Sequence, residues 1–242
     1  SLLSSHDPDT YFDVGTTEVT ITLTDIHGNT TEDVMLVTVT DVEDPLIINL
    51  PERITIPTEP GICEGTTSWE DPDTSDNCGV AMLEVSVESG SMLPVGDTDV
   101  VYTVTDIHGN TTSQAFIVTV EDQEVPQITN VPADSANSND LDECGASVTW
   151  VEPDASDNCA ILTFTSSHAS GDFFEVGTTE VTLTATDVHE NVQTASFLVT
   201  VDDDQDPEIA GMPLDFTATA ESGLRGASVT WTEPTATDNC IE

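Results

Sequence analysis

The chain repeats itself with a constant offset, and this periodicity limits the possible folds more than any other feature. Asp-Asn-Cys occurs three times, and Cys78, Cys159 and Cys240 are evenly spaced, since 159 − 78 = 81 and 240 − 159 = 81. Three tryptophans keep the same offset: Trp69, Trp150 and Trp231. A unit of this length can hold a small core of its own. The periodicity therefore predicts independent modules in tandem, not a solenoid of mutually dependent repeats.

Apolar and polar residues alternate in short segments along each repeat. Val100–Thr105 and Ala115–Val120 carry apolar or β-branched residues at every second position, the period of a strand with one buried face. Turn-forming residues interrupt these segments every eight to twelve residues or so, and no segment has a convincing helical period. We therefore predict an all-β fold of tandem β-sandwich repeats that form an elongated rod.

The repeat divides the chain into two complete modules and two halves. We place complete modules at 42–122 and 123–203, the closing strands of a module at 1–41 and the opening strands of another at 204–242. Neither half can bury a sandwich face alone. We expect a neighbouring chain or continuing sequence to complete them. Because Ser1 begins neither a signal peptide nor a methionine start, we expect a processed product or a segment of a longer protein.

The charge of the chain is strongly one-sided. Asp and Glu number 47 against 2 Lys and Arg, a net charge of −45. Phosphate binding needs a basic face, so nucleic acid is excluded as a natural partner, and no apolar run is long enough for direct membrane insertion. Multivalent cations or high salt would relieve the self-repulsion. The alternative to cation binding is that the charge serves only solubility, or that it marks the surface of a halophile's protein.

Five cysteines indicate an oxidising, extracellular setting. Each complete repeat holds two of them fifteen residues apart. We predict the disulfides Cys63–Cys78 and Cys144–Cys159. Arg225 stands where the third repeat would have its first cysteine, at 144 + 81 = 225. We therefore expect Cys240 to be free or bonded to a group outside the chain.

Several motifs recur in a fixed order. In the order of one repeat they are Ser-Asp-Asn-Cys, Val-Gly-Thr-Thr-Glu-Val, Thr-Asp-Ile-His-Gly-Asn and Phe-x-Val-Thr-Val. The second of these stands at 176–181 in the second complete repeat, and the others stand at 75–78, 105–110 and 116–120 in the first. In this order they resemble tandem hyalin repeat (HYR) modules over essentially the whole chain. The resemblance implies immunoglobulin-like sandwiches of extracellular and adhesion proteins. Arg225 in place of a family cysteine departs from the pattern, as does Glu190 where the other repeats have Gly28 and Gly109.

Acidic residues gather in three segments of every repeat. In an immunoglobulin-like sandwich the entering linker, the loop after the second strand and the loop before the last strand meet at one pole. Calcium takes six to eight oxygen ligands, so we predict a Ca²⁺ site at each module junction. If these loops are ordinary turns, the Asp and Asn side chains bond their own backbone instead.

The candidate ligands follow the three junctions. Those of the first are Asp41, Glu43, Asp44, Asp71, Asp73, Asp76, Asn77, Asp106 and Asn110. Those of the second are Glu121, Asp122, Glu124, Asp154, Asp157, Asn158, Asp187 and Asn191. Those of the split module are Asp202, Asp203, Asp204, Asp206, Asp238 and Asn239, with Asp25 and Asn29 supplied by the neighbouring half.

Other chemistry has weaker support. His27, His108 and His189 lie beside these aspartates, but no close His/Cys spacing supports a zinc cage, so we expect loop residues or outer-shell donors. Asn29 and Asn110 begin weak glycosylation sequons. No nucleophile elbow or phosphate-binding glycine loop occurs, and we predict that the protein is not an enzyme.

The sequence thus predicts a structural extracellular or cell-surface protein. Its modules would build a calcium-stiffened filament or stalk by head-to-tail self-assembly. Two alternatives remain: a calcium-dependent adhesion or ligand-binding module, and an acidic surface-layer protein of a halophile. The same residues recur at the same positions and only 5% of residues are aromatic, which favours a scaffold over a recognition surface.

Overall fold

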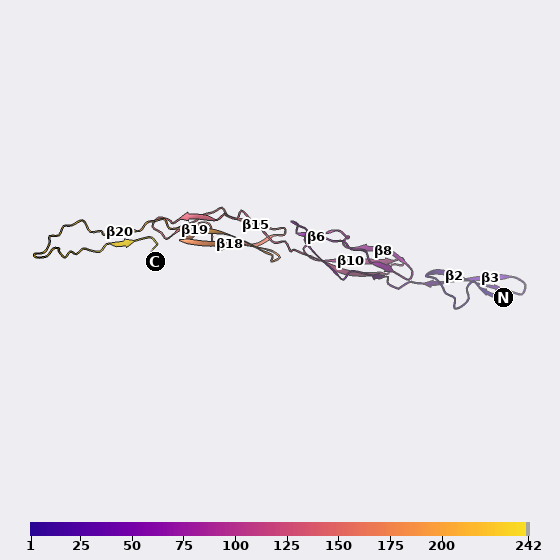
Figure 1. The fold of residues 1–242 in the computed structure, drawn as a ribbon. Coiled ribbons are helices and arrows are strands. Elements are labelled where there is room, and N and C mark those ends of the chain that lie inside the picture. The colour runs from indigo at the N-terminus through magenta and orange to yellow at the C-terminus, as the bar shows by residue number, and fades with distance from the viewer. Residues whose placement is uncertain (241–242) are drawn as a thin grey trace. The chain divides into compact units, whose positions relative to one another are not determined.

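A computed structural model describes residues 1–240, and these residues form strands and turns without any helix. The all-β prediction is therefore confirmed. The described residues divide into two compact units, residues 1–59 with 63–122, and residues 60–62 with 123–240; Figure 1 shows the strands along the chain. Within the described part of the chain, no helix is available that could cross a membrane.

The first unit begins with a three-stranded antiparallel sheet in the order β1-β2-β3. Its strands are β1 (Leu2–Ser4), β2 (Gly15–Thr24) and β3 (Thr30–Val39). A complete module follows. Its strands are β4 (Leu46–Ile48), β5 (Arg53–Pro57), β6 (Glu64–Thr66), β7 (Asp73–Ser75), β8 (Val80–Val85), β9 (Met92–Pro94), β10 (Gly96–Asp106) and β11 (Thr111–Glu121).

This module is a sandwich of two layers. One layer is the sheet β5-β11-β10-β8, in which β5 runs parallel to β11 and the other pairs are antiparallel. The other layer consists of the pairs β4-β7 and β6-β9. Alternate residues of β10 and β11 point into the core, where Val100, Val104 and Val118 are 0% exposed and pack with Ile47 of β4 and Leu93 of β9. Each such burial contributes about 1.5–3 kcal/mol.

The second unit repeats this plan. Its complete module contains β12 (Gln127–Thr129), β13 (Ser135–Ser138), β14 (Gly145–Ser147), β15 (Asp154–Ser156), β16 (Ile161–Ser166), β17 (Phe173–Glu175), β18 (Gly177–Asp187) and β19 (Val192–Asp202). The sheet β13-β19-β18-β16 faces the pairs β12-β15 and β14-β17. The C-terminal segment adds the pair β20 (Glu208–Ala210) and β21 (Thr235–Thr237).

Strand pairing fixes which loops share an end of the first module. Leu46 pairs with Ser75, so the segment after β7 lies at the end where the linker enters, which we call the entry pole. Pro57 pairs with Glu121 and Glu64 with Pro94, so the turn between β5 and β6 lies at the opposite end, the exit pole. Cys63 is therefore at the exit pole, and Cys78 is at the entry pole.

The predicted disulfides within each repeat are wrong for this reason. A repeat's two cysteines lie at opposite poles, however close they are in sequence. Cys144, at the exit pole of its module, is bonded to Cys240 of the next repeat across a sequence separation of 96 residues. Cys78 is a free thiol, whereas Cys63 and Cys159 are not free. The expectation for Cys240 is wrong as well, since its partner lies within the chain.

Gly145 of β14 offers a test of packing in the second module. A Cβ added there would lie 2.5 Å from Cζ of Phe173 and against the carbonyl oxygen of Phe174. We expect Gly145→Ala to lower the free energy of unfolding by about 1–3 kcal/mol, the usual cost of overpacking. Gly226 holds the equivalent repeat position with nothing within 4 Å of such a Cβ. Gly226→Ala should leave the denaturation midpoint unchanged, and equal midpoints for both variants would contradict the prediction.

Candidate metal centre

The candidate site of the first unit begins with Asp106, the last residue of β10. The inward-facing positions of this strand are Val100, Tyr102, Val104 and then Asp106, so the period of two that buries the core also buries this carboxylate. The register between β10 and β8 shifts between Thr105 and Asp106. Asp106 is only 2% exposed.

The turn that follows satisfies both oxygens of Asp106. Oδ1 accepts hydrogen bonds from the backbone amides of His108, Gly109 and Asn110, and Oδ2 accepts one from the Asn110 side chain. Burial acts to raise the pKa of Asp106, but these hydrogen bonds together hold the pKa below its usual range. The charged form is therefore favoured in the folded state. Its stabilisation is present at neutral pH and is lost as the pH falls through the lowered pKa.

Asp41 enters the same place from the linker after β3. Its side chain is 2% exposed, and its Oδ2 lies 3.1 Å from Nδ1 of His108. Its Oδ1 accepts hydrogen bonds from the amide of Glu43 and, at 3.4 Å, from the side chain of Asn77. Burial again opposes the shift, yet hydrogen bonds from its neighbours hold the pKa of Asp41 below the usual range.

Asp76 comes from the loop after β7 and is the incomplete member of the cluster. Its Oδ2 accepts hydrogen bonds from the amides of Cys78 and Gly79. Its Oδ1 is buried and has no hydrogen-bond partner. A buried carboxylate oxygen without a partner costs free energy unless a cation or donor completes it.

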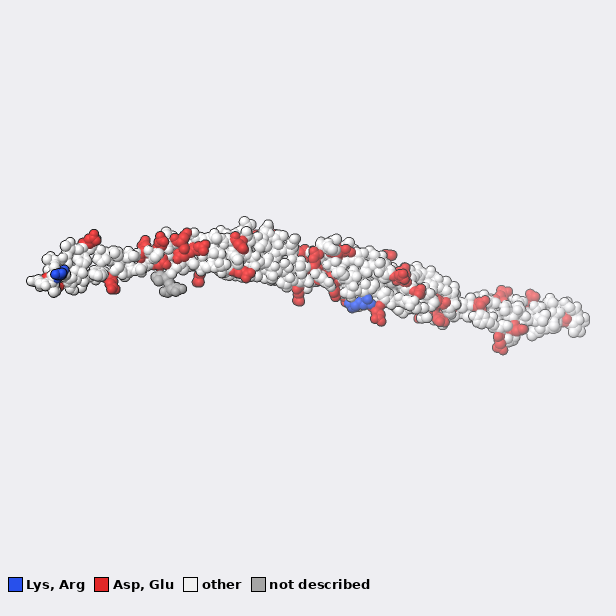
Figure 2. All heavy atoms as spheres, viewed as in Figure 1, with Lys and Arg blue, Asp and Glu red and all other residues white. Residues whose placement is uncertain are grey.

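Oxygens of Asp41, Asp76 and Asp106 all lie within 4.8 Å of one another. We call these three residues the entry-pole cluster. The basic residues of the chain are Arg53, which pairs with Asp97, and Arg225 in the second unit. Asp and Glu side chains are spread over the visible surface (Figure 2). Among the described residues that contact this cluster, none is a lysine or an arginine.

Other predicted ligands of the first junction do not join the cluster in the same way. Asp71 accepts a hydrogen bond from the hydroxyl of Tyr102 at 2.7 Å, and Asp73 accepts one from the side chain of Asn49. Glu43 contributes a backbone amide, and no contact assigns Asp44 to the cluster. Asn110 is close enough to donate to the Asp41 carbonyl oxygen at 3.5 Å.

The second module places its own acidic loops similarly. Asp187 is 0% exposed and accepts hydrogen bonds from the amide and side chain of Asn191. Asp157 lies within 4.8 Å of it and has a buried Oδ1 without a partner. Oδ1 of Asp154 accepts a hydrogen bond from the backbone amide of the next residue in β15. The side chain of Asn158 donates a hydrogen bond to the carbonyl oxygen of Ile62, and the carboxylate of Glu124 accepts one from the amide of Gly61. Glu121 and Asp122 end the first unit, where Asp122 is buried.

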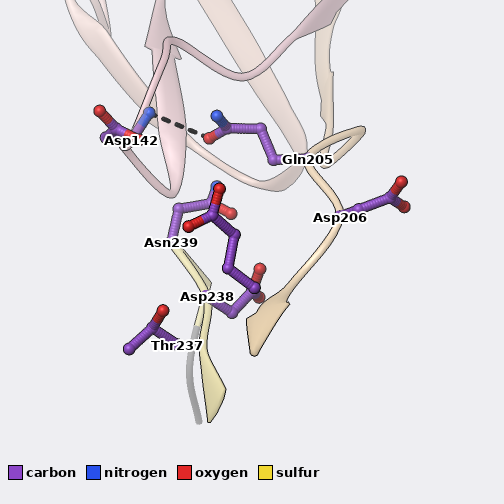
Figure 3. Close-up of a pocket in the computed structure, with 7 residues that line it drawn as sticks. Asp142, Gln205, Asp206, Thr237, Asp238 and Asn239 are labelled. Carbon is purple, nitrogen blue, oxygen red and sulfur yellow. Dashed lines mark hydrogen bonds between the residues drawn. The ribbon is translucent and has the colours of Figure 1, made fainter. Parts of the chain in front are cut away.

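The split module repeats part of this geometry inside the second unit. The side chain of Asn239 donates to Asp203 Oδ1 at 3.4 Å, which matches the contact of the equivalent residues Asn77 and Asp41. The Oδ1 atoms of Asp238 and Asn239 are buried without partners. Asp238, Asn239 and Asp206 all line a cavity of about 250 Å³ (Figure 3). Asp204 instead accepts a hydrogen bond from the hydroxyl of Ser138. Asp202 is the last residue of β19, and its side chain is exposed.

Asp25 and Asn29, predicted to complete that site, form an exposed turn of the N-terminal sheet. Asp25 accepts hydrogen bonds from the amides of His27 and Asn29 and from the Asn29 side chain. The side-chain nitrogens of Asn29 and Asn110 both donate to aspartates, so glycosylation there would require these turns to open. The turn at Glu190 is kept, because Glu190 adopts φ 71° where Gly109 has φ 95°.

Sequence reasoning expected His108 beside these aspartates as a loop residue or outer-shell donor, but it missed that Cys78 lies beside His108. Their ligand atoms and an oxygen of Asp41 lie within 4.8 Å of one another. The recurrence of histidine two residues after the buried aspartate was the available signal. Spacing alone concealed it, since the three residues are 78 − 41 = 37 and 108 − 78 = 30 positions apart.

The reactivity of Cys78 in metal-free protein follows from these surroundings. Burial, a hydrogen bond to Asp41 and the nearby carboxylates raise the pKa of the thiol to about 11. At about pH 8 we expect alkylation by iodoacetamide roughly a hundredfold slower than for an unperturbed thiol of pKa about 8.5. The rate, measured by mass spectrometry in chelator, should rise through about pH 10 to 11. A rate that levels off near pH 8 or 9 would contradict this prediction.

Comparison with known proteins assigns the family. The HYR domain profile matches residues 40–120 and 121–201. The chain belongs to the HYR domain family. The HYR chain is 35% identical over 243 aligned residues to hyalin of Lytechinus variegatus, covering 97% of this chain and 46% of that protein. It is 33% identical to hyalin of Strongylocentrotus purpuratus, covering 97% of this chain and 20% of that protein.

The HYR chain thus spans about half or less of these relatives (46% and 20%). Among solved structures, a protocadherin gammaB7 EC3–6 cis-dimer is similar at 16% identity and a TM-score of 0.33, over 84% of this chain and 62% of that one. That likeness is too low to support an argument. HYR membership and the Cys144–Cys240 disulfide identify an extracellular or cell-surface protein.

Proposed function

We propose that this HYR chain serves an extracellular structural or adhesive role in which Ca²⁺ stiffens the module junctions. The observation that carries the proposal is the buried, unpartnered Oδ1 of Asp76 beside the carboxylates of Asp41 and Asp106. Hard cations bind such oxygen clusters. Here a cation would also relieve the repulsion of three carboxylates that no lysine or arginine neutralises.

The origin of the three carboxylates explains why an ion would stiffen the junction. Asp41 belongs to the linker, whereas Asp76 and Asp106 belong to two loops of the following module. An ion that holds all three fixes the linker on the entry pole. The side chains of Asn77 and Asn110 both contact Asp41, and water can complete the coordination of Ca²⁺.

Head-to-tail assembly is the second part of the proposal. Leu23 and Met35 of the N-terminal sheet are 51% and 54% exposed, although the equivalent residues Val104 and Phe116 are 0% and 2% exposed in the complete module. Trp231 of the C-terminal segment is 59% exposed. Its equivalent Trp69 packs edge-on against Phe116. The C-terminal segment of one copy would thus cover the N-terminal sheet of the next as one half of a module covers the other.

The experiment compares thermal unfolding and particle length in Ca²⁺ and in chelator at matched ionic strength. We expect Ca²⁺ to raise the unfolding midpoint and to lengthen and straighten the particles in small-angle scattering. If salt alone has the same effect, the charge serves solubility as in a halophile and the calcium proposal fails. Sedimentation against concentration tests assembly separately. Growth that Trp231→Ala abolishes would support it, and a monomer at all concentrations would refute it.

A further inference from the structure

The loop after β15 carries both a candidate calcium ligand and a bonded cysteine. Oδ2 of Asp157 accepts a hydrogen bond from the backbone amide of Cys159 at 2.9 Å. Oδ1 of the same carboxylate is buried without a hydrogen-bond partner. Cys159 is disulfide-bonded. The disulfide therefore lies two residues from a carboxylate that the proposed function assigns to calcium.

The split module repeats this arrangement and shows both ends of the tether. Its loop carries Cys240, which is bonded to Cys144 after the turn between β13 and β14. Beside the disulfide, the side chain of Asn239 donates a hydrogen bond to the carbonyl oxygen of Glu143 at 2.9 Å. Oδ2 of Asp238 accepts a hydrogen bond from the amide of Cys240, while Oδ1 is buried without a partner. A disulfide beside the acidic ligand is thus a property of the repeat.

The carboxylates that this loop helps to bring together repel one another. A carboxylate oxygen of Asp157 lies within 4.8 Å of one from Asp187, which is 0% exposed. The chain has no lysine, and no described ion pair brings an arginine to these two residues. Without a cation, the repulsion favours movement of the loop away from Asp187. The disulfide opposes that movement, because it fixes the loop to another part of the chain.

A bound cation and the disulfide therefore stabilise the same position of the loop. The cation attracts both carboxylates, and the disulfide limits the distance over which they can separate. Two influences that favour the same state are coupled, and the coupling is reciprocal. Reduction of the disulfide must weaken cation binding, and a bound cation must oppose reduction.

We propose that the disulfide at Cys159 regulates the calcium response of the junction. An external dithiol is the reductant: one of its thiolates attacks a sulfur of the disulfide, the protein S–S bond breaks, and its second thiolate closes a new disulfide within the reductant. The two electrons and the two protons of the dithiol end on the two protein sulfurs. Cys159 is only partly buried, so the reductant can reach it. This inference deepens the proposed function and rests on it.

The experiment equilibrates the native chain with mixtures of reduced and oxidised dithiothreitol, in Ca²⁺ or in chelator at matched ionic strength. Alkylation and mass spectrometry then give the reduced fraction of Cys159. We expect saturating Ca²⁺ to raise the ratio of reduced to oxidised reagent needed for half-reduction by about 5- to 150-fold, the usual range for coupled sites. Calorimetry in excess reductant should find weaker Ca²⁺ binding than in the oxidised chain.

Two matched variants separate the site from general screening of charge. Asp157→Asn keeps an oxygen for the amide of Cys159 but loses the charge, so the effect of Ca²⁺ on reduction at Cys159 should shrink. Asp154→Asn is the control. Because Asp154 bonds the next amide of β15, its replacement should leave the effect of Ca²⁺ unchanged.

Two results would overturn the inference. One is equal reduction of Cys159 in Ca²⁺ and in chelator, although calorimetry shows that the oxidised chain binds Ca²⁺. The other is an undiminished effect of Ca²⁺ in Asp157→Asn, which would assign the protection to screening. Either result leaves the proposed function standing, because calcium would still bind the oxidised chain. Failure of the oxidised chain to bind Ca²⁺ would reject the proposed function and this inference together.

Discussion

Replacing Cys144 and Cys240 together by serine should release the C-terminal segment of the second unit, the largest effect that we expect from any change. The disulfide spans 96 residues. For a loop of that length the chain-entropy model gives a stabilisation of about 4.7 kcal/mol. Packing offers little compensation, because residues 208–236 are almost entirely exposed. Beyond the disulfide, the described contacts include one between Asn239 and the Glu143 carbonyl oxygen.

Hydrogen exchange with mass spectrometry measures this effect segment by segment. Amides of β20 and β21 should lose their protection in the double variant, whereas β18 and β19 should keep theirs. Cys78→Ser is the matched control, since that cysteine is free. Retained protection of β20 and β21 in the double variant would show that packing, and not the disulfide, holds the segment.

The sandwich layers were predictable because their signal is local. Alternation with a period of two identifies β10 and β11, and the constant offset between repeats carries the assignment from one module to the next. The convergence of Asp41, Asp76 and Asp106 followed from the pole at which the loops of an immunoglobulin-like sandwich meet. Composition could not distinguish these three cluster residues from Asp71, which accepts a hydrogen bond from Tyr102 and lies outside the cluster.

The cysteine pairing could not be predicted because it depends on strand direction. Cys144 and Cys159 are close in sequence, but β14 and β15 carry them to opposite ends of the module. Equal spacing in each repeat is compatible with bonds inside a repeat and with bonds between repeats. The proximity of Cys78 and His108 was hidden for the same reason, since these residues meet only after β8 and β10 have folded.

Replacing Asp76 by asparagine should change stability in opposite directions with and without Ca²⁺. Asparagine keeps an oxygen for the amides of Cys78 and Gly79 but removes one of three neighbouring negative charges. In chelator the variant should therefore be at least as stable as the unmodified chain, because like charges repel. In Ca²⁺ it should be less stable, because the ion loses a charged ligand.

We expect calcium affinity to fall at least tenfold or so, which removes about 1.4 kcal/mol of calcium-linked stabilisation at a saturating concentration. Calorimetric titration and unfolding midpoints in Ca²⁺ and in chelator measure the two effects on the same samples. Asp71→Asn is the matched control, because Asp71 bonds Tyr102 outside the entry-pole cluster and its loss should leave the calcium response intact. A variant at Asp76 that loses equal stability under both conditions would show that this carboxylate only shapes its turn. A reversal of sign would show that the buried oxygen of Asp76 stabilises the chain only when a cation binds.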